Sequence, residues 1–161
     1  MNTGVGSIIQ PLTQSSKRKC GLRDSHILWL RRTEQTDWIF ERVTSTVLEY
    51  NTAYRFEIDG QPDTAQLTRY AASQQYNWHM DLGSGRASLR KITAVVELSS
   101  ETIRSGGGIE IFYGEEIKNK VTLDVGDMIV FPSFVMHRAS RVRDGIRWSL
   151  VLWFNGHMPF R

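Results

Sequence analysis

Four histidines occur in the chain, and two of them stand where they could hold a metal ion. His79 and Asp81 form a His-x-Asp pair. In an extended segment, residues two apart point to the same side, so this imidazole and this carboxylate could grip one ion. With His137, which follows the apolar run 128–131, they could form the facial triad of non-haem Fe(II) oxygenases, which leaves positions open for a co-substrate and O2. The alternative is that His79 and Asp81 are a hydrogen-bonded pair at the surface.

Arg147 indicates what such a co-substrate could be. It shares one face of an expected strand, residues 146–154, with Ser149 and Trp153, and the opposite face is apolar. Burying an arginine is costly unless an anion pairs with it. A guanidinium can bind a carboxylate through two parallel hydrogen bonds, and Ser149 could add a third. A dicarboxylate that chelates iron at one end and reaches Arg147 at the other is 2-oxoglutarate. The alternative is that Arg147 faces solvent or pairs with an acid such as Asp144.

Residues 36–50 are expected to form a helix. Thr36 or Asp37 could cap its start and Asn51 could end it in a left-handed turn. Apolar residues at steps of four support the helix: Ile39, Val43 and Val47.

Most of the remaining chain predicts short strands separated by turn residues. The expected strands cover 27–30 (a strand or a turn), 54–58, 92–98, 109–113, 128–131 and 146–154. Short alternating strands with Gly-rich or Asp-Gly turns between them favour an antiparallel sandwich or barrel.

Length and composition limit the class of protein. The chain has 161 residues, of which 40% are hydrophobic and 23% charged, as in an ordinary single globular domain. No apolar run approaches the roughly 20 residues needed to cross a bilayer, and the start of the chain lacks the pattern of a secretory signal. A single cysteine, Cys20, cannot form an internal disulfide. We therefore expect a cytoplasmic protein with no membrane partner.

The positive charge is concentrated near the N-terminus. Residues 1–35 carry six basic and two acidic side chains, a net +4, and the remainder carries 14 basic and 15 acidic side chains, a net −1. We expect residues 1–24 to be a loose basic arm and residues 25–161 to be the functional domain. Because the part of the chain after residue 35 carries no net positive charge, we do not expect a nucleic-acid partner.

Several motifs follow one another in a fixed order. They are Tyr70-x-x-Ser73-x-x-Tyr76-x-x-His79-x-Asp81, Arg90-Lys-Ile-Thr-Ala-Val-Val-Glu-Leu-Ser99, Gly107-Gly108-Ile-Glu110, Leu123-Asp-Val-Gly126 leading to His137, and Gly145-x-Arg147-x-Ser149-Leu-Val-x-Trp153. Over residues 54–161, and more weakly over 23–53, the chain resembles the Fe(II)- and 2-oxoglutarate-dependent oxygenases. The similarity is to the prolyl 4-hydroxylase-like branch and its PKHD-type relatives. That family usually has glycine where Ser73 stands.

The resemblance implies a mainly β (α+β) fold, a double-stranded β-helix of the jelly-roll or cupin type with a supporting N-terminal helix. It also implies Fe(II), 2-oxoglutarate and O2, with ascorbate as a candidate addition. The implied site residues are the iron ligands His79, Asp81 and His137, the 2-oxoglutarate residues Arg147, Ser149 and Tyr70, and the substrate-side residues Arg90, Trp153 and Tyr76, of which Tyr76 could equally serve packing.

The implied activity is hydroxylation of an unactivated C–H bond, foremost in a peptidyl proline, with succinate and CO2 as products. A free amino acid or small metabolite is an alternative substrate, and a nucleic-acid demethylase or a non-catalytic cupin-like binding module are alternative functions. Relatives usually begin with a further helix that residues 1–22 do not resemble. The outer face of the barrel could therefore be covered by a partner, including a second copy of the chain in a homo-oligomer.

Overall fold

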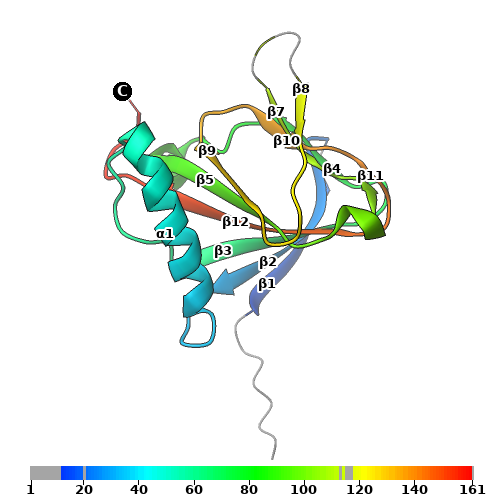
Figure 1. The fold of residues 1–161 in the computed structure, drawn as a ribbon, viewed down its shortest axis with the longest axis horizontal. Helices are drawn as coiled ribbons and strands as arrows, with labels where there is room; N and C mark the ends of the chain where they lie inside the picture. Colours follow the sequence, from blue (N-terminus) through cyan, green and yellow to red (C-terminus); the bar gives the residue numbers. More distant parts are fainter. Residues whose placement is uncertain (1–11, 20, 113, 115–117, 161) are drawn as a thin grey trace, which may run out of the picture.

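A curled antiparallel sheet dominates the computed structural model, which describes residues 12–19, 21–112, 114 and 118–160 (Figure 1). Its strands are β1 (Leu12–Lys19), β2 (Arg23–Arg31), β3 (Thr64–Tyr70), β4 (Gln75–His79), β5 (Arg90–Glu97), β7 (Ile109–Phe112), β8 (Lys118–Val121), β9 (Met128–Pro132), β10 (His137–Ala139) and β12 (Arg147–Asn155). The order across the sheet is β8-β7-β10-β4-β2-β3-β12-β5-β9, and β1 pairs with β2. Strands far apart in sequence, such as β4 and β10, thus become neighbours.

The remaining elements are short except for one helix. Strands β6 (Ser105–Gly106) and β11 (Val142–Asp144) pair with each other, and two 3-10 turns cover Gly85–Leu89 and Glu101–Ile103. Helix α1 (Asp37–Tyr54) lies along one face of the curled sheet (Figure 1).

Side chains alternate between the two faces of the strands. One face packs in the apolar core beneath α1, and the other lines the pocket inside the barrel. On β12, Leu150, Leu152 and Phe154 belong to the same buried cluster as Phe40 and Val47 of α1. The other face of β12 lines the pocket described below. The predicted division of this strand into an apolar face and an arginine-bearing face is therefore confirmed, and packing of the apolar face on the helix holds the second face toward the pocket.

Helix α1 is longer than the sequence predicted, and the expected strand 54–58 is absent. The helix runs to Tyr54, and Arg55 ends it in the left-handed conformation with φ 56°. The Asn51 side chain does not stop the helix but bridges to the chain beyond it, since it bonds both the backbone N–H and the carbonyl of Phe56 at 3.0 and 2.9 Å. A five-residue alternating pattern was too short to distinguish a strand from the end of a helix and its exit.

The expectation of a loose arm over residues 1–24 is wrong where the structure describes it. Residues 12–19 form β1, which pairs with β2 from Leu12 opposite Leu30 to Lys19 opposite Asp24, and β2 already begins at Arg23. An edge strand is held by backbone hydrogen bonds to its neighbour, and such pairing needs no apolar period in the sequence. Residues 1–11 and 20 lie outside the described residues, and a domain boundary at residue 24 stays a prediction.

One side of α1 borders an open groove on the outer face of the sheet. The groove has a volume of about 680 Å³, and Leu67, Val96 and Leu150 of the sheet form part of its floor. A homo-oligomer stays a prediction. Among the described residues, no helix is long and apolar enough to cross a membrane.

Candidate metal centre and the pocket around it

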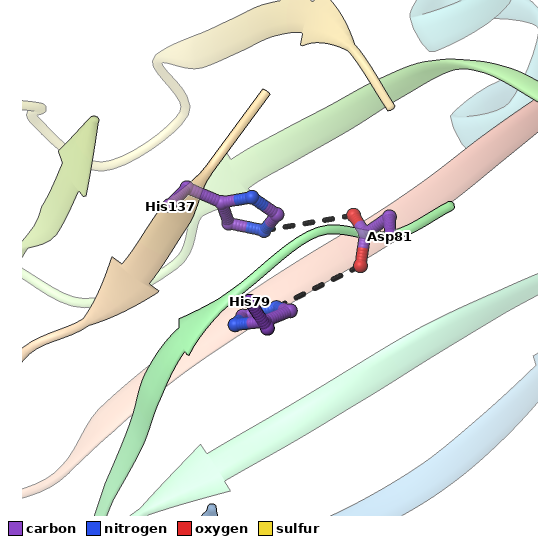
Figure 2. A group of neighbouring side chains, drawn as sticks. All are labelled: His79, Asp81 and His137. Carbon is purple, nitrogen blue, oxygen red and sulfur yellow. Dashed lines mark ion pairs between the residues drawn. The ribbon is translucent and has the colours of Figure 1, made fainter. Parts of the chain in front are cut away.

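His79, Asp81 and His137 meet at one end of the barrel interior, as the sequence predicted (Figure 2). His79 is the last residue of β4, Asp81 lies just beyond it, and His137 opens the neighbouring strand β10. The Nε2 atoms of His79 and His137 lie 3.7 and 3.6 Å from the two carboxylate oxygens of Asp81. One donor atom from each residue falls within 4.8 Å of the other two, which is close enough to share a single ion.

Backbone carbonyls orient both imidazoles. The Nδ1 of His79 lies 2.7 Å from the Asn77 carbonyl oxygen, and the Nδ1 of His137 lies 2.9 Å from that of Val135. A carbonyl can only accept, so each ring carries its proton on Nδ1 and keeps the Nε2 lone pair free to bind a metal. Burial lowers the pKa of His79 to about 4, and a proton on the neighbouring His137 would lower it further, so the His79 ring is neutral near pH 7.

The carboxylate of Asp81 has supports of its own. Its Oδ2 accepts a hydrogen bond of 2.8 Å from the Thr93 hydroxyl on β5, which also lies 3.0 Å from the Ser133 hydroxyl. The backbone N–H of Asp81 donates to the Ser133 carbonyl at 3.0 Å. Sequence reasoning missed Thr93 and Ser133. The signal for Thr93 was its polar side chain on the inward face of β5.

A pocket of about 200 Å³ opens beside the three residues. It holds every site residue that the sequence predicted: Tyr70, Tyr76, His79, Asp81, Arg90, His137, Arg147, Ser149 and Trp153. Residues that the sequence did not single out also line it, among them Arg23, Trp29 and Gln66.

Arg147 lies in this pocket and is only 2% exposed. Its Nε donates to Glu97 Oε2 at 2.9 Å, and Glu97 Oε1 also lies 3.4 Å from Arg104 Nη2. The expected alternative partner, Asp144, is therefore not the acid that Arg147 contacts. Nη2 of Arg147 is buried with no hydrogen-bond partner among the described residues. An unpaired buried donor is costly, so this atom marks a place for an acceptor that the chain does not supply.

Two hydroxyl-bearing residues line the same pocket near Arg147. Tyr70 lies opposite Arg147 in the pairing of β3 with β12, and Ser149 follows two residues later on the same face. Tyr70 and Ser149 are 4% and 2% exposed. Burial raises the pKa of Tyr70, against the positive charges of Arg23 and Arg147, so its hydroxyl keeps its proton and can donate. The local chemistry suits a carboxylate.

Aromatic rings form the other wall. The Arg90 guanidinium lies 3.9 Å from the ring centroid of Trp153, and its Nη1 donates to the Asp81 carbonyl at 3.0 Å. Tyr76 stacks on His79 with ring centroids 3.4 Å apart. Trp153 Nε1 is a second buried donor without a partner among the described residues.

Comparison with known proteins agrees with this geometry. A family model for the 2-oxoglutarate-Fe(II) oxygenase superfamily matches residues 65–155, more than half of the chain. The chain belongs to this superfamily. The matched segment contains all three residues of the triad, together with Arg147 and Ser149.

The curated relatives of this chain are longer proteins. A PKHD-type hydroxylase of Rippkaea orientalis is 30% identical over 119 residues, which make up 70% of this chain and 52% of that protein. The chain spans about half the length of the curated relatives it matches.

Solved structures confirm the fold class. A prolyl-4-hydroxylase from Pseudomonas putida aligns with a TM-score of 0.72 at 21% identity, covering 89% of this chain and 78% of that one. A prolyl hydroxylase from Trichoplax adhaerens, in complex with a hypoxia inducible factor peptide, aligns with a TM-score of 0.66 at 17% identity, covering 88% and 70%. The predicted double-stranded β-helix with a supporting helix is the fold of this chain.

Proposed function

We propose that the protein is an Fe(II)- and 2-oxoglutarate-dependent dioxygenase that hydroxylates an unactivated C–H bond, foremost in a peptidyl proline. The observation that carries the proposal is the presence, in one pocket, of a metal-ligand triad and a buried guanidinium with an unpartnered Nη2. The triad alone would suit several divalent metals, and the guanidinium alone would suit many anions. Together they favour a small dicarboxylate that reaches both.

His79, Asp81 and His137 would hold Fe(II). Two imidazoles and one carboxylate would hold the ion and leave open positions for the co-substrate and O2. When bound, the iron supplies O2 activation, with 2-oxoglutarate oxidised to succinate and CO2 while a substrate C–H bond becomes C–OH. The part of the protein is to keep the three donors in place through the Asn77, Val135 and Thr93 contacts.

Arg147, Ser149 and Tyr70 would bind the distal carboxylate of 2-oxoglutarate. Glu97 holds the Nε edge of Arg147, and this leaves Nη2 to bond the carboxylate. The hydroxyls of Ser149 and Tyr70 add neutral donors beside it. This arrangement explains why a cation buried to 2% exposure is retained in the barrel.

Arg90, Trp153 and Tyr76 would face the substrate. The two structural neighbours, a prolyl-4-hydroxylase and a prolyl hydroxylase in complex with a peptide, support a peptidyl proline as the target. We further propose a cytoplasmic location, consistent with the single cysteine, and ascorbate as a reductant that sustains turnover.

The test is a parallel assay of succinate and of hydroxylated product. Wild-type protein with Fe(II), 2-oxoglutarate and O2 is incubated with proline peptides, free amino acids and methylated oligonucleotides, and products are read by mass spectrometry. We expect a mass gain of one oxygen in a proline peptide, matched by succinate. Hydroxylation of a free amino acid, or loss of a methyl group from an oligonucleotide, would replace the proposed substrate. No succinate with any substrate would favour a non-catalytic binding module.

Asp81 variants sharpen this test. Asp81→Ala should lose iron binding and product together. Asp81→Glu keeps the charge but moves the carboxylate by roughly 1 Å, and a misplacement of that size can reduce catalysis by about 100-fold. We expect Asp81→Glu to retain measurable iron binding with little product. Wild-type product levels from Asp81→Ala would remove this carboxylate from the metal site.

A further inference from the structure

Arg23, at the start of β2, is a further arginine in the same pocket. It is 8% exposed. Its Nε donates to the Ser25 hydroxyl at 2.8 Å, and its Nη2 lies 3.4 Å from the Thr68 hydroxyl. Both partners are neutral, so they satisfy hydrogen bonds without balancing the charge.

Arg147, Arg104 and Arg138 each have an acid within ion-pair distance, whereas Arg23 does not; the half-buried Arg90 contacts the Asp81 carbonyl and the Trp153 ring instead. Glu97 serves both Arg147 and Arg104, and Glu110 lies 2.7 Å from Arg138. Among the described residues, no carboxylate lies within ion-pair distance of Arg23. The adjacent Asp24 instead accepts a hydrogen bond of 2.7 Å from Gln74. An uncompensated buried cation is unfavourable, and a bound anion would offset that cost.

The position of Arg23 indicates where that anion would sit. Its guanidinium carbon lies 4.5 Å from the ring centroid of Tyr76, the ring that stacks on His79. Tyr70 also lies within reach of its positive charge, which partly offsets the burial that raises the pKa of the Tyr70 hydroxyl. The Arg147 guanidinium carbon lies 5.8 Å from the same Tyr70 ring. Arg23 and Arg147 thus each lie beside a tyrosine ring of the same pocket.

We propose that Arg23 is a positioning residue for the distal carboxylate of 2-oxoglutarate, acting through its own uncompensated charge in the pocket that Arg147 also lines. The inference rests on the proposed function, because it assigns a further residue to the proposed co-substrate. The charge of Arg147 is already shared with Glu97, whereas that of Arg23 is free to favour a dianion over a monoanion. Arg23 thus selects 2-oxo acids that carry a second carboxylate.

The test compares two ligands that differ only at the far end. 2-Oxoglutarate and 2-oxopentanoate share the chelating 2-oxo acid and the chain length, but 2-oxopentanoate lacks the distal carboxylate. Binding to the Fe(II)-loaded protein is measured by anaerobic calorimetry, so that no turnover occurs. The variants are Arg23→Gln and Arg23→Lys, with Arg31→Gln, an exposed arginine on the same strand, as control. Melting temperatures of the ligand-free proteins are measured in parallel.

We expect Arg23→Gln to weaken 2-oxoglutarate binding by about tenfold or more, in line with the loss of a charge-assisted contact, and to change 2-oxopentanoate binding by less than about twofold. Arg23→Lys, which keeps the charge, should lose less. Arg31→Gln should match wild type with both ligands. The ligand-free melting temperature of Arg23→Gln should not fall, since the variant removes an uncompensated buried charge.

Other outcomes would overturn the inference. Unchanged 2-oxoglutarate affinity in Arg23→Gln, or equal weakening of both ligands, would assign Arg23 a purely structural role. If Arg23→Gln does not fold, a folded Arg23→Lys that binds both ligands with wild-type discrimination supports the charge argument, and one that loses the discrimination overturns it. Wild-type protein that binds no 2-oxoglutarate would overturn the proposed function and this inference together, whereas the results above leave the function standing.

Discussion

At the metal end of the pocket, each imidazole is held by a carbonyl two residues before it, whereas at the other end Arg147 depends on a carboxylate 50 positions away. The two histidines and Asp81 thus have their supporting hydrogen bonds in place. The arginine end retains a buried Nη2 without a partner among the described residues and a second guanidinium, Arg23, without an acid there.

The two ends of the pocket should therefore respond differently to substitution. A preorganised metal site should lose its function when any ligand is removed, because the remaining donors have no alternative arrangement. The arginine end should respond in a graded way, because several donors share one carboxylate and the loss of one leaves the others.

The largest effect is expected at the metal end. His137→Ala should abolish saturable Fe(II) binding and reduce succinate formation by at least about 100-fold, because one of three protein ligands is lost. Iron titration and a succinate assay measure both quantities. The control is His157→Ala, an exposed histidine that lies 3.2 Å from Asp59. Near-normal turnover in His137→Ala would contradict the assignment of His137 as a required metal ligand.

Arg147→Ala tests the other end. Each charge-assisted hydrogen bond contributes roughly 1.5–3 kcal/mol, so 2-oxoglutarate binding should weaken by about 10- to 100-fold while Fe(II) binding persists. Arg147→Lys should be intermediate, since an ammonium cannot reproduce the planar fork. Calorimetry gives the affinities, with Arg143→Ala, an exposed arginine, as control. Unchanged 2-oxoglutarate affinity would mean that another residue is the anchor.

Thr93→Val measures how much the hydrogen bond from Thr93 to Asp81 contributes to iron affinity. The substitution keeps the shape and removes the 2.8 Å hydrogen bond to Oδ2. Iron affinity should fall by about 10-fold, the lower end of the range for such supporting contacts, and 2-oxoglutarate affinity measured on iron-saturated protein should change little. Thr52→Val, at an exposed position near the end of α1, serves as control. An equal loss for both ligands would show that the two ends are not independent.

The smallest effect is expected away from both ends, at Ser73. This residue has φ 70°, a left-handed conformation, where the family usually has glycine. The conformation costs roughly 1–2 kcal/mol for a residue with Cβ, and the greater freedom of unfolded glycine offsets part of that gain. Ser73→Gly should therefore stabilise the protein by up to about 1 kcal/mol, raising the melting temperature by about 2–4 °C, with no change at either end of the pocket.

A second glycine variant serves as the reference for Ser73→Gly. Ser84 has φ −83°, so Ser84→Gly removes no strain and should be neutral or destabilising in the same melting experiment. A lower melting temperature for Ser73→Gly than for wild type would contradict the strain argument.

Much of the fold was predictable because it depends on alternation within single strands. The expected strands 92–98, 109–113 and 128–131 correspond to β5, β7 and β9, and the face of β12 that carries Arg147 was identified correctly. The sequence-based predictions failed for segments whose conformation is fixed by contacts with another part of the chain. β1 is held by pairing with β2, and residues 55–58 are placed by contacts such as the Asn51 side chain on Phe56 and the packing of Phe56 against Phe160.

The site residues that meet in the pocket were predictable from local patterns in the sequence. His-x-Asp at the end of an extended segment, a later histidine, and an arginine beside a serine on an inward face are local patterns, and the spacing of side chains along one strand decides them. The pairing of buried arginines with acids, by contrast, depends on the fold. Glu97 lies 50 positions from Arg147 and becomes its partner only because β5 and β12 are neighbours in the sheet, and Arg23 enters the pocket only because β2 lies between β3 and β4. Strand order and register bring these groups together, and the burial that makes a charge costly exists only after the barrel has closed around it.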